Sequence, residues 1–269
     1  MPPVEPTVSS PAEFLPRPVQ ARQGAPAEQT GSWKTLATRD RRALFERALD
    51  SLWLVFQPIV WLSRPDGPPF AFEALARNAE AQVSDPRELL SLAGSVGQIG
   101  ELGRVVHNRA SGTLRRNKNM TLFVNVDVDE LLGPLVEGGD DLAEFAHRVV
   151  LEVTERTPIS DLPEVRKRSG VLRGQGYRFA IDDLGGGYAG LASLVLLDPQ
   201  FVKVDKALIR DVDTKPINRN IVGSLVALTR QLGIKCIVEG VETEGERNTL
   251  EALHCDLMQG YLFGRPGAL

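Results

Sequence analysis

The stretch LWLVFQPIVWLSRPDGPPFAFEALAR, residues Leu52–Arg77, constrains the fold of this chain more than any other. It contains two apolar runs, LWLVFQPIVWL and PFAFEALAR, separated by SRPDGP. Such runs are typical of buried strands. Six residues are too few for a helix, and a parallel crossover needs about a dozen residues or more. The stretch therefore predicts two neighbouring antiparallel strands.

Further along the chain, apolar runs alternate with helical patterns. The runs are LFVNVD, RVVLEVTE, RFAIDD, FVKVD, KCIVEGVE and LMQGYLF. They are apolar on both faces, as buried parallel strands are. Eight such strands with helices between them, in about 230 residues, predict an α/β fold, a modified TIM (β/α)8 barrel whose first strand is antiparallel. An open doubly wound sheet is the alternative.

Helix signals stand between these runs. Ser84, followed by Pro86 and Glu88, marks a helix start, and Gly233 marks the end of a later helix. The later helix carries an apolar stripe that we expect to be its buried face, formed by Ile221, Leu225, Leu228 and Leu232.

The N-terminal segment differs in composition from the rest of the chain. Its first 30 residues hold seven of the 18 prolines. Such a segment does not bury enough apolar surface to fold, so we expect residues 1–32 to be disordered and residues 33–269 to form one domain.

Charge and composition exclude several classes of function. The net charge of −4 argues against a DNA or RNA polymer as the partner, because phosphate neutralisation needs a basic face. No apolar run reaches the roughly 18 residues of a membrane span, and no signal peptide is visible. The two cysteines, Cys236 and Cys255, form no CxxC pair, which is typical of a reducing compartment. We expect a cytoplasmic protein.

Polar residues recur where the strands end. They are Glu73, Asn125, Glu152, Glu155, Asp182, Asp183, Lys203, Asp205, Glu239, Glu242 and Gln259. A single acid after a strand is usually a helix cap, and we expect that role for Asp205. Seven successive strands with such ends instead indicate one shared site, because the C-terminal strand ends of a barrel meet at one rim.

The chemistry of these residues favours hard metal ions. Carboxylates and a carboxamide suit Mg²⁺ or Mn²⁺, and no strand end carries the His or Cys of a zinc site. Several carboxylates in one cavity repel each other unless cations neutralise them. Paired divalent ions would do so, and they activate water for attack on phosphorus. The strand ends therefore predict a two-metal phosphoryl hydrolase.

Eight sequence blocks, taken in order, resemble the EAL domain family. They are FQPIV, FEALAR, VNVD, LEVTE, IDDLGGGYAGL, FVKVDK, VEGVET and DLMQGYLFGRP. The resemblance runs from about residue 52 to residue 266. It implies a bacterial phosphodiesterase on a modified TIM barrel that hydrolyses cyclic di-GMP to linear pGpG with Mg²⁺ or Mn²⁺. It also implies a homodimer, and it leaves room for a regulatory protein partner.

The resemblance assigns roles at the metal site. The metal ligands it implies are Glu73, Asn125, Glu152, Asp182, Asp183 and Glu239. Asp182 would bridge two ions, and Asp183 and Glu239 would lie near the second. Lys203 would orient or deprotonate the attacking water, and Gln259 would lie near that water. Lys203, Glu239, Asp183 and Gln259 form the implied catalytic group.

Other matched positions imply contacts with the substrate and with a loop. Arg77 would contact a substrate phosphate, Gln57 would line the nucleotide pocket, and Glu242 would belong to the same substrate-binding group. Glu155 would hold the loop after the fifth strand. In that loop Leu184 and Gly186 stand where the family has Phe and Thr. This departure bears on the rate and on coupling to a dimer.

Three functions stay open at this point. The first is an active cyclic di-GMP phosphodiesterase. The second is a catalytically weak or inactive domain that binds cyclic di-GMP as a receptor and signals through a protein partner. The third is a scaffold for protein interactions alone.

Overall fold

The computed structural model describes residues 32–133, 141–154, 162–185 and 190–269. The chain divides into two units, Met1–Thr30 and Gly31–Leu269, and the described residues all belong to the second. The segment predicted to be disordered therefore lies outside them, except for Ser32, which begins the first 3-10 helix.

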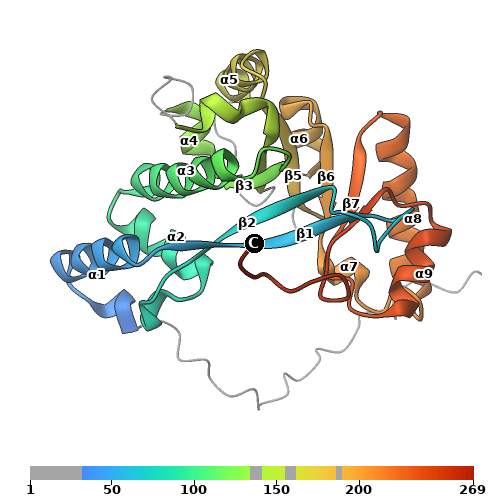
Figure 1. The fold of residues 1–269 in the computed structure, drawn as a ribbon, viewed down its shortest axis with the longest axis horizontal. Helices are drawn as coiled ribbons and strands as arrows, with labels where there is room; N and C mark the ends of the chain where they lie inside the picture. Colours follow the sequence, from blue (N-terminus) through green and yellow to red (C-terminus); the bar gives the residue numbers. More distant parts are fainter. Residues whose placement is uncertain (1–31, 134–140, 155–161, 186–189) are drawn as a thin grey trace, which may run out of the picture. The chain divides into compact units, whose positions relative to one another are not determined.

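The strands and helices alternate along most of the chain (Figure 1). The strands are β1 Trp53–Trp61, β2 Ala71–Arg77, β3 Leu122–Val126, β4 Val149–Thr154, β5 Arg178–Leu184, β6 Phe201–Val204, β7 Lys235–Val238 and β8 Leu257–Met258. The α-helices are α1 Thr38–Asp50, α2 Pro86–Ser95, α3 Ile99–Arg116, α4 Val128–Leu132, α5 Leu162–Gly174, α6 Gly190–Leu197, α7 Lys206–Ile209, α8 Pro216–Gln231 and α9 Glu244–Ala252. The 3-10 helices are η1 Ser32–Thr35, η2 Ala81–Val83 and η3 Asp141–Arg148.

The strands close into a barrel in the order β1 to β8. β1 is antiparallel to both of its neighbours, β2 and β8, and every other pair is parallel. The predicted modified TIM barrel is confirmed, and the open sheet is excluded. The short link SRPDGP returns the chain directly beside β1, where the Phe70 N–H donates to the Ile59 carbonyl at 2.8 Å.

One apolar residue from each strand fills the barrel interior. These residues, named here the apolar layer, are Ile59, Ala71, Phe123, Val150, Ala180, Phe201, Ile237 and Leu257. Two of them, Phe123 and Phe201, meet edge to face with ring centroids 5.1 Å apart. All are at most 3 % exposed, so the layer is a closed apolar floor for the residues that follow it towards the rim of the barrel.

The expected apolar stripe of α8 is confirmed only in part: Leu225 packs against the buried clusters, but the fully buried face is displaced by one residue. Ile221 and Leu232 are 38 % and 54 % exposed, and the buried residues are Val222, Val226 and Thr229. The helix contains two overlapping apolar series, at 221/225/228 and at 222/226, so hydrophobicity alone does not choose between them. The valine series is buried because α8 packs against β7, where Val222 and Val226 join the apolar cluster around Val238.

The start of α2 also differs from expectation by one residue. Asp85, and not Ser84, is the N-cap, because its carboxylate accepts the Arg87 N–H at 2.8 Å. Pro86 consequently stands at the first helical position, where its missing N–H costs nothing. Among the described residues, no helix combines the length and the apolar character needed to cross a membrane.

The apolar layer generates a stability prediction. Phe123→Ala should lower the free energy of unfolding by about 3–5 kcal/mol, because it removes a ring from a closed layer that cannot collapse around the gap. Ile217→Ala, at a side chain that is 65 % exposed on α8, should change it by no more than about 0.5 kcal/mol. Urea unfolding measures both. Equal small effects would mean that the layer does not support the barrel.

Candidate active site

A ring of polar side chains lies directly above the apolar layer. Side chains two positions apart on a strand share a face. Two positions beyond each member of the apolar layer, towards the rim, stands a polar residue, either on the strand or, for β7 and β8, directly after it. This polar ring consists of Gln57, Glu73, Asn125, Glu152, Asp182, Lys203, Glu239 and Gln259. The fold therefore brings residues that are about 200 positions apart in sequence into contact, as in the Gln57–Gln259 hydrogen bond of 3.1 Å.

Lys203 is the centre of the polar ring. Its side chain is 1 % exposed, and its ammonium contacts four carboxylates. The Nζ–O distances are 2.5 Å to Glu239, 2.8 Å to Glu152, 3.2 Å to Glu73 and 3.5 Å to Asp182. One cation therefore faces four acidic side chains.

The charges shift one another's protonation. Burial lowers the pKa of Lys203, but Asp182, Glu152, Glu239 and Glu73 outweigh it and hold that pKa well above its usual range. Burial raises the pKa of Glu239 to about 8 despite the nearby ammonium. Burial also raises the pKa of Glu152 well above its usual value. A cation that enters the site has to displace protons held by these carboxyls.

Amide side chains fix the orientation of the carboxylates. Asn125 donates through Nδ2 to Glu73 at 3.2 Å and to Glu152 at 3.3 Å. Gln259 donates through Nε2 to Glu73 at 2.6 Å. These donors and Lys203 outweigh burial at Glu73 and lower its pKa. Each amide thereby turns its own oxygen away from the carboxylate that it holds.

The adjacent Asp182 and Asp183 serve one site because the backbone bends between them. Asp183 has φ of +59°, in the left-handed region, and the β5–β6 register shifts between Ile181 and Leu184. Asp is among the few residues that adopt this conformation readily. As a result, oxygens of Asp182, Asp183 and Glu239 lie within 4.8 Å of one another. The bend was expected from the glycines that follow, but it is located at Asp183 itself.

The donor set fits a hard divalent ion. Three carboxylates converge, and the buried Oε1 of Gln259 has no hydrogen-bond partner among the residues that the structure describes. Oxygen donors of this kind suit Mg²⁺ and Mn²⁺. The four acidic side chains around Lys203 give such an ion a further electrostatic reason to bind.

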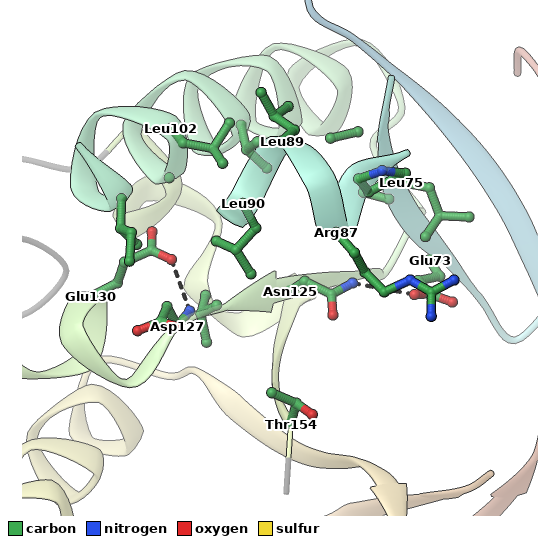
Figure 2. Close-up of a pocket in the computed structure, with 17 residues that line it drawn as sticks. Glu73, Leu75, Arg87, Leu89, Leu90, Leu102, Asn125, Asp127, Glu130 and Thr154 are labelled. Carbon is green, nitrogen blue, oxygen red and sulfur yellow. Dashed lines mark hydrogen bonds between the residues drawn. The ribbon is translucent and has the colours of Figure 1, made fainter. Parts of the chain in front are cut away.

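Two cavities flank the polar ring, and both are lined by Glu73 and Leu75. The first cavity, of about 330 Å³, lies between β2, β3 and the helices α2, α3 and α4 (Figure 2). The second, of about 260 Å³, is lined by Gln57, Asp182, Glu239, Gln259 and their neighbours. A ligand held at the ring therefore has space on both sides.

Some predicted site residues lie outside this group. Arg77 ends β2, and its guanidinium donates to the Ala76 carbonyl at 2.8 Å; it lines neither cavity. Glu242 lines the second cavity but pairs with Arg210 at 2.6 Å. Glu155 and Gly186 lie outside the described residues. Asp205 caps α7 by accepting the Ala207 N–H at 2.6 Å, in agreement with the structural role expected for it.

Several residues that line the cavities were not predicted from the sequence. They are Leu75, Arg87 and Glu130 in the first cavity and Lys206, Gly240 and Tyr261 in the second, where Leu75 recurs. One of them had a readable signal. Asp127 and Glu130 have the spacing of a capping box just after β3, and the structure shows that box.

Comparisons with known proteins match the chain to the same family that its sequence blocks resemble. The family model described as EAL domain matches residues 41–266. The bifunctional diguanylate cyclase/cyclic di-GMP phosphodiesterase MucR of Pseudomonas aeruginosa is 32% identical over 243 residues, which are 84% of this chain and 34% of MucR. The cyclic di-GMP phosphodiesterase NbdA of the same organism is 33% identical over 233 residues, 81% of this chain and 29% of NbdA.

Similarity to solved structures points to the same family. The PaMucR phosphodiesterase in complex with c-di-GMP superposes with a TM-score of 0.75 at 30% identity, covering 85% of this chain and 98% of that one. The chain spans about a third of the length of the curated relatives it matches. Because the family model matches most of the chain, residues 41–266, the chain belongs to the EAL domain family.

Proposed function

We propose that this domain is a metal-dependent phosphodiesterase that hydrolyses cyclic di-GMP to linear pGpG. The observation that carries the proposal is the convergence of Asp182, Asp183 and Glu239 beside the buried ammonium of Lys203. The relatives add support, since MucR and NbdA are named cyclic di-GMP phosphodiesterases. The receptor and scaffold functions lack an observation of this kind.

Different residues at this site have different proposed roles, either in holding metal ions or in positioning water. Glu73, Asn125, Glu152, Asp182, Asp183 and Glu239 would hold two Mg²⁺ or Mn²⁺ ions. When bound, such ions supply an activated water and offset charge on the phosphoryl oxygens. Lys203 keeps its proton because its pKa is raised, so it acts by orienting the water and donating hydrogen bonds. Gln259 presents its buried Oε1 next to this group and positions the same water.

The remaining assignments concern the substrate. Gln57 and Glu242 line the second cavity and are proposed to contact the dinucleotide there. Arg77 is half-buried at the rim end of β2, and its contact with a substrate phosphate stays a prediction. The same holds for Glu155 as the support of the loop after β5.

The first test is direct. Purified protein with cyclic di-GMP and Mg²⁺ or Mn²⁺ should release pGpG, detected by chromatography. Glu73→Gln should reduce turnover by more than 100-fold, since changes in residues that merely support ligands already cost about 10–100-fold. The matched control is Glu251→Gln, at an exposed acid on α9, which should behave as the parent protein.

The outcomes separate the three functions. Product formation that Glu73→Gln abolishes supports the phosphodiesterase. Tight binding of cyclic di-GMP without product would overturn it in favour of a receptor. A protein that neither binds nor hydrolyses the dinucleotide would leave only the scaffold.

Replacement of the metal gives a second test. Ca²⁺ should compete with Mg²⁺ and inhibit turnover, because its longer and looser coordination does not support the geometry of the smaller ion. Initial rates measured at fixed Mg²⁺ with rising Ca²⁺ report the effect. Full activity with Ca²⁺ as the sole divalent ion contradicts the two-metal proposal.

Lys203 generates a prediction about stability and pH. Lys203→Met should lower the free energy of unfolding of the metal-free protein by about 3–5 kcal/mol at pH 7, because it leaves buried carboxylates uncompensated. Without Lys203, burial is no longer outweighed at Glu73, so the pKa of that carboxyl rises in the folded state. The loss is therefore present above the pKa of an unfolded carboxyl and is relieved as pH falls.

The measurement is urea unfolding with chelator at pH 7 and pH 5. The difference between Lys203→Met and the parent should shrink at the lower pH. Lys118→Met, at an exposed lysine, is the control and should show no such trend. A loss that is independent of pH would mean that Lys203 stabilises by packing and not by charge.

A further inference from the structure

The second cavity has a basic residue in its wall that the proposed reaction does not yet use. Among the described residues that line this cavity, Lys206 is the one lysine or arginine, and the acidic ones are Glu73, Asp182, Glu239 and Glu242. Lys206 is exposed, and its ammonium forms no ion pair with any residue that the structure describes. An anion that enters the second cavity therefore meets one available ammonium.

The other cations near the second cavity are engaged. Lys203 contacts the four acidic side chains of the polar ring. Arg210 pairs with Glu242 at 2.6 Å. Arg77 donates to a backbone carbonyl and does not line the cavity. Among the described residues, Lys206 is thus the cation best placed to bind an anion there.

The backbone of Lys206 is fixed by the short helix that it begins. It is the first residue of α7 and follows the N-cap Asp205, whose buried carboxylate accepts the Ala207 N–H at 2.6 Å. The Lys206 carbonyl accepts the Arg210 N–H at 2.9 Å, at the other end of this turn. The position from which the side chain leaves the backbone is therefore well defined.

Gly240 fixes the base of the lysine side chain. A Cβ added at Gly240 would lie 2.5 Å from Cβ of Lys206, so a larger residue would push the lysine away. Gly240 also has φ of +72°, a conformation that favours glycine. Both residues line the second cavity. The turn after β7 thereby brings its bare backbone against Lys206 at the wall of the cavity.

The proposed substrate carries a second anion beside the bond that is cleaved. Cyclic di-GMP is a closed ring of two nucleotides joined by two phosphodiesters, each with one negative charge. When one phosphodiester lies at the polar ring, the other is held close by the same macrocycle. The second cavity shares Glu73, Asp182, Glu239 and Gln259 with the polar ring, so it is the adjoining space. A lysine ammonium is a suitable partner for a phosphate group.

We propose that Lys206 is a substrate-binding residue that holds the phosphodiester that is not cleaved. The inference rests on the proposed function. The uncleaved phosphodiester keeps the same charge in the substrate, in the transition state and in linear pGpG. A contact with it therefore stabilises all three alike, which lowers KM and leaves the rate of the chemical step unchanged. Lys206 thus differs in role from Lys203, which is proposed to orient the attacking water.

Steady-state kinetics with Lys206→Met test this role, because the variant keeps an apolar stem and removes the charge. Its KM for cyclic di-GMP should rise about 10-fold, near the lower end of the loss for a hydrogen bond to a charged group, and its kcat should not fall. Lys206→Arg should restore most of the affinity. Lys118→Met, at an exposed lysine on the N-terminal side of β3, is the control for a lost charge and should behave as the parent protein.

Salt dependence separates the charge of Lys206 from the packing of its stem. Affinities of the parent and of Lys206→Met for cyclic di-GMP are measured by calorimetry with Ca²⁺ in place of Mg²⁺. Their difference should shrink from about 0.1 M to about 1 M KCl, because the Debye length falls from about 10 Å to about 3 Å. A difference that does not change with salt would show that the stem acts by packing, and it would overturn the inference.

The outcomes distinguish this inference from the function beneath it. If the parent protein neither binds nor hydrolyses cyclic di-GMP, the proposed function and this inference fail together. If the parent hydrolyses it and Lys206→Met has an unchanged KM, only this inference fails. A fall in kcat at unchanged KM would also overturn it, because Lys206 would then act in the chemical step. If the parent binds without hydrolysis, the proposed function fails, and the calorimetric loss in Lys206→Met, about 10-fold or none, still decides the role of Lys206.

Discussion

The contact of one buried ammonium with four carboxylates is the constraint on which the site depends. Lys203 lies in the barrel with almost no solvent exposure and touches Glu73, Glu152, Asp182 and Glu239. Without a cation at this position the acids would repel each other in a low-dielectric interior. Lys203 is thus the cation that allows these four acidic side chains to be buried side by side.

The position of the acids follows from the pleat of the strands. Each polar residue stands two places beyond a buried apolar one, as Glu152 follows Val150 and Lys203 follows Phe201. The same alternation that packs the floor of the barrel therefore aims the functional side chains at a single point. For this reason the sequence was sufficient to predict the eight strands, the antiparallel first strand and the strand-end residues that form the ring, except for Gln57, which only the family resemblance had pointed to.

The sequence was not sufficient where two arrangements satisfy the same pattern. On α8 both apolar series have helical spacing, and only the packing against the cluster around Val238 selects Val222 and Val226. At Glu130 the capping-box spacing is visible, but the approach of Gly103 from α3 is a contact between distant elements that no local pattern encodes. The sequence predicted that the backbone bends near Asp182 and Asp183. It did not predict which residue bends, because the glycines that follow were equally able to adopt the left-handed conformation.

The reversal of β1 has a consequence for how the chain enters the barrel. In a regular barrel the first strand begins on the face opposite the active site. Here Trp53, the first residue of β1, pairs with Arg77 at the rim end of β2, so β1 begins on the side of the barrel that carries the polar ring. Just upstream, Nε1 of Trp33 donates to Glu88 at 2.8 Å, and Glu88 lies on α2, the helix that walls the first cavity. The start of β1 and the polar ring therefore lie at the same end of the barrel, which a regular barrel keeps apart.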